Sequence, residues 1–187
     1  MKYLRYFISV FLLSILALQA FFFLQILAWR WVNPPITAFQ LAERHRLCGW
    51  SIPYIHTCEI KQEWIEFKKI SPYLKRAITI SEDSDFYRHV GFEPQAMKDA
   101  WDRNQKNSKH IRGGSTITQQ LAKNLFLSGE KNYVRKVQEL AITAMLEIAL
   151  PKNRIFEIYL NSVEWGEGVF GIAAASQHYF AIKPNQL

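Results

Sequence analysis

The chain has 187 residues, 49% of them hydrophobic and 14% aromatic, and its 23 Lys and Arg residues against 16 Asp and Glu residues give a formal net charge of +7. This length suits one globular domain plus an extra segment. The positive charge predicts an acidic partner, such as nucleic acid, anionic lipid headgroups or a diphosphate-bearing substrate. The two cysteines do not have the spacing of a zinc site, which argues against a zinc-binding class.

The N-terminal region contains the longest apolar stretch. No charge interrupts residues 6–29, and about 24 residues in a helix would cross roughly 30 Å of hydrocarbon. Lys2 and Arg5 precede this stretch, which favours a cytoplasmic N-terminus and an exported remainder, although Arg30 weakens the bias. A cleaved signal peptide ending near Ala20 is the alternative. Because the apolar run continues past that point, an uncleaved transmembrane anchor is favoured. An exported, membrane-tethered domain meets lipids and not a genome, so no nucleic-acid partner is expected.

Residues 30–70 are predicted to be a linker and membrane-proximal segment. Two consecutive prolines after the anchor break any helix that leaves it. The mixed, aromatic pattern that follows predicts irregular structure and then a short helix near residues 60–69. Cys48 and Cys58 would lie on the exported side, where they could form a disulfide or remain two free thiols. The sequence leaves both states open.

Residues 71–187 show helical apolar spacing and no sustained alternation of the strand type, which predicts an all-α domain. Ser71 caps a first helix with proline in its first turn, and this helix leads to Glu82. Another helix opens at residues 92–94, and a polar loop at 104–110 follows it. The buried stripe of that second helix is expected to be Ala96, Met97, Ala100 and Trp101.

The later helices are predicted from their caps. A two-glycine turn precedes a helix whose cap is Ser115 or Thr116, and Asn132 caps a longer helix that ends at the next proline. Two further helices are expected, one from Asn153 and one over residues 172–180. The inward face of the long helix is predicted to be Val137, Leu140, Ala144 and Ile148.

Two adjacent acids, Glu82 and Asp83, stand at the end of the first helix, before an aromatic residue and a His-x-Gly turn. An acid in this setting can be partly desolvated, which would raise its carboxyl pKa and make it a better general base near neutrality. A solvated acid at a helix end is the alternative. His89 is expected to serve the turn or the packing, because no nucleophile pairs with it by spacing.

The helix after the two-glycine turn carries polar residues at helical spacing. Ser115, Gln119 and Lys123 recur every four residues on one face, with Gln120 and Asn124 beside them. Hydroxyl, amide and ammonium groups near a helix N-terminus suit sugar hydroxyls and phosphate oxygens. An ordinary amphipathic helix with a solvated polar face shows the same pattern, and this stretch alone favours that simpler reading.

A mainly basic run follows at Lys131, Arg135, Lys136 and Glu139. Arg135 and Glu139 are four residues apart and could form an exposed helical ion pair. Alternatively, Lys131 and Arg135 neutralise a departing diphosphate while Glu139 supplies a second carboxylate across the cleft.

Residues 166–171 match the dinucleotide-binding pattern G-x-G-x-x-G letter by letter. That pattern requires a preceding strand and a surrounding βαβ unit. Here a predicted helix precedes it, so a tight loop is expected and nucleotide binding is excluded.

Five motifs, taken together, resemble those of a known family. E-D-x-x-F-x-x-H-x-G at 82–91 and G-G-S-T-I-T-Q-Q-L-A-K-N at 113–124 resemble the first two signatures of the peptidoglycan glycosyltransferases, the family 51 transglycosylases. R-K-V-Q-E at 135–139, I-F-E-I-Y-L-N at 155–161 and the region 171–180 resemble the others. Five motifs in order are far more specific than any single short pattern. With one anchor and no downstream transpeptidase domain, the chain is similar to the monofunctional biosynthetic members.

The resemblance implies a lysozyme-like helical fold and processive polymerisation of lipid II onto a growing glycan strand. Glu82 matches the family's catalytic base, which takes the proton from the acceptor's GlcNAc 4-hydroxyl. That oxygen attacks C1 of the donor's MurNAc and expels undecaprenyl diphosphate, which gives an inverted β-1,4 link. A diphosphate leaves readily when its charge is screened, so one base with nearby cations suffices.

The remaining site residues also come from the resemblance. Glu139 matches the second family carboxylate, with a positioning or metal-assisted role. A divalent cation, Mg²⁺ or Mn²⁺, is therefore an optional cofactor, and no metal ligand is assigned. Lys123 matches a substrate-phosphate contact, and Lys131 stands where relatives can have Arg, whose bidentate grip a lysine lacks. The implied substrate-binding residues are Asp83, Ser115, Thr116, Gln119, Gln120, Lys123, Asn124, Lys131 and Arg135.

The resemblance further implies a single-pass protein of the bacterial inner membrane, with its catalytic domain in the periplasm. Its expected partners are lipid II, inner-membrane lipids and other cell-wall synthesis and division proteins. The expected division is a cytoplasmic stub at 1–5, an anchor at 6–29, a linker at 30–70 and a catalytic domain at 71–187. The family domain normally continues with further helices after the point reached at Leu187, so either the sequence is truncated there or the protein is a short member.

Two other functions fit parts of the pattern. One is a lysozyme-like hydrolase or lytic transglycosylase that cuts the same glycan with Glu82 as general acid. The other is an inactive, membrane-bound scaffold of the wall-synthesis machinery.

Overall fold

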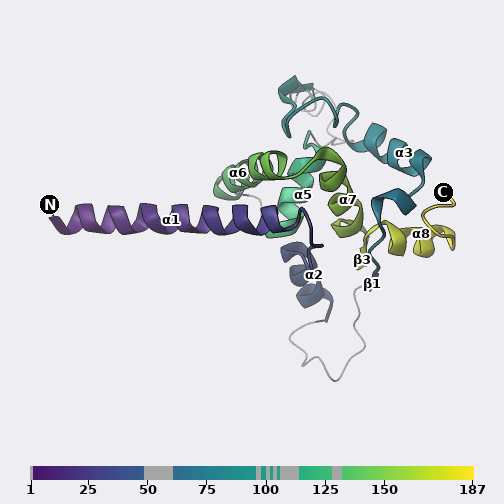
Figure 1. The fold of residues 1–187 in the computed structure, drawn as a ribbon, viewed down its shortest axis with the longest axis horizontal. Helices are drawn as coiled ribbons and strands as arrows, with labels where there is room; N and C mark the ends of the chain where they lie inside the picture. The colour runs from purple at the N-terminus through teal and green to yellow at the C-terminus, as the bar shows by residue number, and fades with distance from the viewer. Residues whose placement is uncertain are drawn as a thin grey trace.

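A computed structural model of the chain describes residues 2–48, 61–95, 98–99, 102, 105, 114–127 and 132–187. A long helix projects from a mainly helical body, and its outer part has no other element beside it (Figure 1). The body confirms the predicted helical fold class, with one small sheet added. The predicted stripe at 96–101 and most of the polar loop at 104–110 lie outside the described residues.

The anchor helix α1 spans Lys2–Ala28. Within the described part of the chain it is the one helix long and apolar enough to cross a membrane, and the chain is membrane-anchored. Its C-terminal end packs into the body: Ile26 is fully buried, and the Trp29 ring stacks 5.1 Å from that of Phe126. Arg154 donates hydrogen bonds to the backbone oxygens of Trp29 and Val32. The anchor therefore leaves the body at a fixed angle.

The segment after the anchor is more regular than predicted. Irregular structure was expected there, but α2 spans Ala38–Cys48. The missed signal is a capping box: the Thr37 hydroxyl accepts from the backbone N–H of Gln40, whose side-chain oxygen accepts from the backbone N–H of Thr37. The prediction of a disulfide or two free thiols concerns Cys58 and the Cys48 side chain, which lie outside the described residues.

The prediction of a short helix near residues 60–69 is largely wrong. Strand β1 occupies Lys61–Gln62 and is followed by a 3₁₀ turn, η1, at Phe67–Lys69. Strands β2 (Glu164–Gly166) and β3 (Val169–Phe170) form a hairpin, and β1 pairs in parallel with β3 to give the order β1-β3-β2. A two-residue strand is too short to show an alternating pattern in the sequence. Strand β1 therefore forms only because it pairs with β3. The predicted tight loop at 166–171 is this hairpin and the turn that follows it.

The helices of the body follow their caps. Helix α3 spans Pro72–Glu82 with Ser71 as cap, α5 spans Ile117–Phe126 with Thr116 as cap, and α6 spans Tyr133–Ala149 with Asn132 as cap. Helices α7 (Lys152–Ser162) and α8 (Ile172–Phe180) follow. The described residues at 94–95, 98–99, 102 and 105 are helical too, where a helix opening at 92–94 was predicted. These bounds confirm the predicted helices to within a residue or two. For α3, α5 and α6 the cap side chain accepts a backbone N–H locally, which fixes the start of the helix.

The core surrounds α5, which packs against α6 and α7. Its fully buried side chains include Ile117, Leu121, Ile142, Leu146, Ile155 and Ile158. The ring of Phe86, from the turn after α3, lies 5.5 Å from that of Phe156 in α7. This packing fixes the end of α3 against α7 and so determines where Glu82 stands.

The predicted inward face of α6 is wrong. Val137 and Ile148 are 67% and 76% exposed, whereas Glu139, Ile142, Thr143 and Leu146 are buried. Apolar residues occur on two faces of this helix, and the prediction chose the face without a charge. The face that carries Glu139 is the buried one. Burial is tolerated because Arg135 and Lys136 pair with Glu139 and so neutralise the charge of its carboxylate.

Candidate active site

A pocket of about 330 Å³ brings Glu82 and Lys123 together. Glu82 is the last residue of α3, and Lys123 lies on α5. The pocket joins segments that are far apart in sequence, since α2, α7 and β2 also contribute to its wall. Its lining consists of Phe39, Glu82, Gln120, Lys123, Asn124, Tyr159, Val163, Glu164 and Trp165.

Glu82 stands at the mouth of this pocket. Its Oε2 accepts a hydrogen bond of 3.0 Å from Gln120 Nε2, and no other hydrogen bond reaches its carboxylate from the described residues. The side chain is exposed, so the expectation of a partly desolvated acid is wrong. The reason is its place at the end of α3, where the chain turns away and leaves the carboxylate facing the opening.

Asp83 is buried behind Glu82 and does not line the pocket. Its side chain is 1% exposed, and its Oδ2 accepts the backbone N–H of Ile117 at 3.0 Å. Its carboxylate also faces His89 Nε2 at 2.9 Å. Asp83 therefore ties the turn after α3 to the N-terminus of α5, where a carboxylate is stabilised by the helix dipole.

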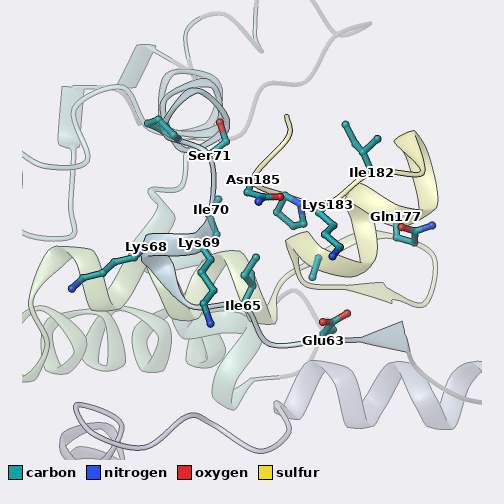
Figure 2. Close-up of a pocket in the computed structure, with 13 residues that line it drawn as sticks. Glu63, Ile65, Lys68, Lys69, Ile70, Ser71, Gln177, Ile182, Lys183 and Asn185 are labelled. Atoms are coloured by element: carbon teal, nitrogen blue, oxygen red, sulfur yellow. The ribbon is translucent and has the colours of Figure 1, made fainter.

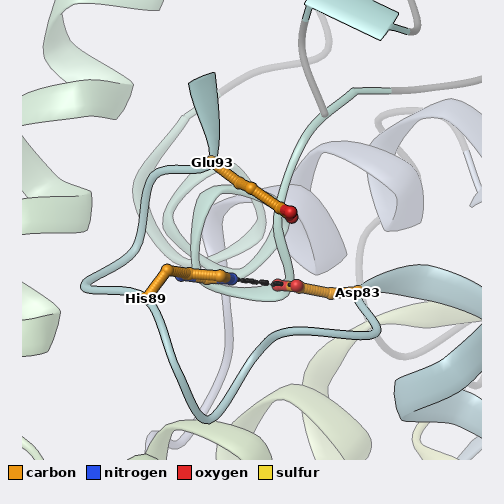
Figure 3. A group of neighbouring side chains, drawn as sticks. All are labelled: Asp83, His89 and Glu93. Atoms are coloured by element: carbon orange, nitrogen blue, oxygen red, sulfur yellow. Dashed lines mark hydrogen bonds and ion pairs between the residues drawn. The ribbon is translucent and has the colours of Figure 1, made fainter. Parts of the chain in front are cut away.

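Asp83, His89 and Glu93 come close enough to suggest a cation site, with ligand atoms within 4.8 Å of one another (Figure 3). The hydrogen bonds do not suit a metal. The Gly91 backbone N–H donates to His89 Nδ1 at 3.0 Å, so Nδ1 carries a lone pair and the proton on Nε2 points at Asp83. Mg²⁺ and Mn²⁺ also prefer oxygen ligands. This cluster is a structural hydrogen-bonded group. The predicted role of His89 in the turn fits this geometry.

The start of α5 separates residues that the sequence placed on one polar face. Thr116 and Gln119 form a reciprocal capping box, and Gln119 is fully buried. Thr116 Oγ1 also donates to the Gly91 backbone oxygen at 2.8 Å. These two side chains hold the turn and do not line the pocket. Ser115 is partly buried and contributes its backbone oxygen, which accepts a long bond of 3.4 Å from Gln120.

Three predicted residues of α5 do face the pocket: Gln120, Lys123 and Asn124. The Lys123 ammonium lies 5.6 Å from the ring centre of Phe39 on α2, close enough for a cation–π attraction. Asn124 donates to the backbone oxygen of Gln120 at 2.9 Å. A cation and amide groups on one wall suit a substrate that carries phosphate and sugar hydroxyls.

Glu139 lies outside the pocket lining and is 3% exposed. Its carboxylate accepts from Arg135 at 2.6 Å and from Lys136. Arg135 is thus occupied by an internal ion pair, and the exposed helical pair expected from sequence is instead a largely buried one. Lys131 lies outside the described residues.

The sequence analysis did not assign five residues of the lining to the site: Phe39, Tyr159, Val163, Glu164 and Trp165. Phe39 belonged to the segment predicted as irregular. Tyr159 lies in the I-F-E-I-Y-L-N motif, where its apolar neighbours suggested helix packing alone. Tyr159 donates to Gln120 at 3.1 Å, and this contact has no local sequence signal because 39 residues separate the two.

A larger cavity of about 550 Å³ lies between η1 and the C-terminal segment (Figure 2). Its polar lining includes Glu63, Lys68, Lys69, Gln177 and Lys183. None of the residues that the motifs single out for chemistry lines it. Size alone therefore does not identify the site, and the smaller pocket is the one that Glu82 and Lys123 line.

Known proteins resemble this chain along its full length. A family model for transglycosylases matches residues 52–187. The biosynthetic peptidoglycan transglycosylase of Cupriavidus metallidurans is 56% identical over 187 residues, covering 100% of this chain and 79% of that protein. Those of Cupriavidus pinatubonensis and Ralstonia nicotianae are each 54% identical over 187 residues, covering 100% of this chain and 73% and 79% of the relatives. With its membrane anchor, its helical body and the motif acid Glu82 in a pocket beside a cation, the chain belongs to the transglycosylase family.

Proposed function

We propose that this chain is a peptidoglycan glycosyltransferase that polymerises lipid II into β-1,4-linked glycan strands. The observation that carries the proposal is the placement of Glu82 and Lys123 in one pocket of a membrane-anchored transglycosylase. The relatives' names, biosynthetic peptidoglycan transglycosylase, support the same activity. A glycan-cleaving enzyme would need Glu82 as a general acid, and an exposed carboxylate suits a base better.

In the proposed reaction, Glu82 removes the proton from the 4-hydroxyl of the acceptor's GlcNAc. The resulting oxygen forms a bond to C1 of the donor's MurNAc, from the face opposite the leaving group. The bond from C1 to the phosphate oxygen breaks, and undecaprenyl diphosphate leaves with the electron pair. The anomeric centre is inverted, and the proton rests on the Glu82 carboxylate.

Lys123 is assigned to the diphosphate. Its ammonium lies on the pocket wall, where a positive charge stabilises the negative charge that develops on the departing oxygen. Asn124 offers its amide group to sugar hydroxyls on the same wall, whereas the Gln120 amide is bonded to Glu82 and Tyr159. Asp83, Thr116 and Gln119 are assigned a supporting role, because their side chains hold the start of α5 and the turn after Glu82.

The cellular setting is proposed from the anchor. Lys2 and Arg5 at the start of α1 favour a cytoplasmic N-terminus, which places the body in the periplasm of a bacterium with the anchor in its inner membrane. A lipid-linked donor would reach the pocket from that membrane. Other cell-wall synthesis and division proteins are proposed as partners.

The test uses the full chain in detergent with purified lipid II. The wild-type chain is expected to give glycan polymer, and Glu82→Gln is expected to give none while unfolding at the same temperature. The control is Glu66→Gln, which changes an exposed carboxylate in the η1 region that pairs with Lys69 and should leave polymerisation intact. Shortened glycan in place of polymer would favour a hydrolase, and an active Glu82→Gln variant would remove the proposed base.

A further inference from the structure

Tyr159 is a buried hydroxyl-bearing residue of the pocket that the reaction above does not use. We propose that Tyr159 is a positioning residue, which holds the general base Glu82 in its reacting orientation through the side chain of Gln120. This inference rests on the proposed function, because it assigns the base role to Glu82. It adds a residue on α7 to a site otherwise built from α3 and α5.

Three side chains form a continuous hydrogen-bonded chain. The Tyr159 hydroxyl donates to Gln120 Oε1 at 3.1 Å, and Gln120 Nε2 donates to Glu82 Oε2 at 3.0 Å. The second N–H of the Gln120 amide points to the backbone oxygen of Ser115 at 3.4 Å. All three side chains line the same pocket.

The tyrosine hydroxyl decides which way the amide faces. An amide presents an oxygen at one position and an N–H₂ group at the other. If Gln120 were rotated by half a turn, its oxygen would face the negatively charged oxygen of Glu82, which is repulsive. The Tyr159 hydroxyl stabilises the productive orientation, because its proton meets the amide oxygen and leaves the N–H₂ group for the carboxylate. A phenylalanine ring would offer no such preference.

Tyr159 is itself held firmly. It is 2% exposed, its ring stacks 6.2 Å from that of Phe156, and the Trp165 ring meets it edge-on at 6.1 Å. Burial, together with the carboxylates of Glu82 and Asp83, raises the pKa of the phenol, so the hydroxyl keeps its proton. Because the Tyr159 donor is rigid and protonated, it fixes the orientation of Gln120, and Gln120 in turn fixes that of Glu82.

Glu82 needs this support because it is exposed. A free glutamate side chain samples several rotamers, and each misplaced rotamer lowers the fraction of molecules ready to react. With Oε2 held by Gln120, the other oxygen, Oε1, has no hydrogen bond among the described residues. Oε1 is therefore the atom placed to accept the proton of the sugar hydroxyl.

The first test is Tyr159→Phe, which keeps the buried ring and removes the hydroxyl. In lipid II polymerisation, kcat is expected to fall about tenfold, because a tenfold change in rate corresponds to the free energy of about one hydrogen bond. KM is expected to change less than about twofold. The acid limb of the kcat profile should move to higher pH, because the carboxylate more often lacks its N–H donor. The other charged groups of the pocket, Lys123 on α5 and Glu164 in β2, are unchanged in this variant. Tyr73→Phe, at an exposed position of α3, is the control and should behave as wild type.

The second test is a double-mutant comparison with Gln120→Leu. If Tyr159 acts through Gln120, then Gln120→Leu and Gln120→Leu/Tyr159→Phe will have the same kcat and the same pH profile. Additive losses in the double variant would overturn the proposal, since they would mean that Tyr159 acts independently. Wild-type kcat and pH profile in Tyr159→Phe would overturn it as well. A wild-type chain that forms no polymer would instead refute the proposed function, so the two failures are distinguishable.

Discussion

Gln19 of the anchor helix and Gln138 of α6 exchange two side-chain hydrogen bonds, of 2.9 and 3.1 Å, across 119 residues of sequence. Gln19 belongs to the apolar anchor helix, and Gln138 directly precedes the buried Glu139. The pair therefore connects the anchor to the helix that carries Arg135 and Glu139. An amide facing apolar surroundings gains most when both of its polar ends are paired.

Gln19→Leu is expected to lower the free energy of unfolding by about 1 kcal/mol, because it leaves the Gln138 amide without its partner. Thermal unfolding in detergent micelles measures this change. Gln19→Leu/Gln138→Leu should recover part of the loss, since replacing both partners leaves no unpaired amide. The control is Ser14→Ala, because the Ser14 hydroxyl bonds only to the backbone oxygen of Val10 in its own helix. Equal melting temperatures for Gln19→Leu and Ser14→Ala would contradict the prediction.

Glu139→Gln is expected to destabilise the body by about 3 kcal/mol, the lower end of the range for breaking a buried ion pair. The reason is that Arg135, whose side chain is 16% exposed, loses its charged partner. Lys136 is 34% exposed and can reach water instead, which limits the loss. Chemical denaturation measures the difference. A variant that unfolds like wild type yet fails to polymerise lipid II would show that Glu139 takes part in the chemistry and does not merely hold α6.

The stability of the body should fall at alkaline pH because of Tyr159. Its phenol has a pKa raised by burial and by two carboxylates above the ordinary value of 10.0. Below about pH 10 the phenol is neutral in both folded and unfolded chains and has no pH-dependent effect. Above that value the unfolded phenol ionises first, which favours unfolding until the folded pKa is reached. Denaturation of wild type and Tyr159→Phe from pH 8 to 11 should show a steeper decline for wild type, and parallel declines would rule this out.

Substitutions at the two ends of α8 are expected to have opposite effects on stability. Gly171, before the helix, has φ of 77°, and a Cβ there would lie 2.7 Å from the backbone oxygen of Asn161. Gly171→Ala should therefore destabilise by at least about 1 kcal/mol. Ala181, after the helix, has φ of 56° in the left-handed region, so Ala181→Gly should stabilise by about 0.5–1 kcal/mol. Melting temperatures that move in the same direction for both variants would show that backbone conformation does not govern these positions.

Local signals in the sequence gave good predictions where the hydrogen bonds are local. Ser71 and Asn132 were expected as caps, with Thr116 as one of two candidates, and each accepts a backbone N–H two or three residues ahead. The capping box at Thr37 and Gln40 was equally visible in sequence and was overlooked. Strand β1 was not predictable in this way, because Lys61 and Gln62 become a strand only by pairing with Val169 and Phe170.

The candidate site likewise has features that the sequence predicted and features that depend on contacts between distant segments. The motif placed Glu82 and Lys123 in one site, and they do line one pocket. Sequence periodicity could not tell that Gln119 is buried in a capping box while its neighbour Gln120 holds Glu82. It gave Asp83 no partner and treated the Arg135–Glu139 pair as exposed, although both carboxylates are buried and paired inside the body.

The order of amino acids by itself determined the membrane anchor, the start of each capped helix and the acid that serves as candidate base. These depend on the length of an apolar run and on contacts within about four residues. Only the tertiary structure decided which polar side chains face the pocket, which are buried, and that Tyr159 reaches Glu82 through Gln120. A buried polar group is stable only when a partner meets it, and here those partners come from segments far away along the chain.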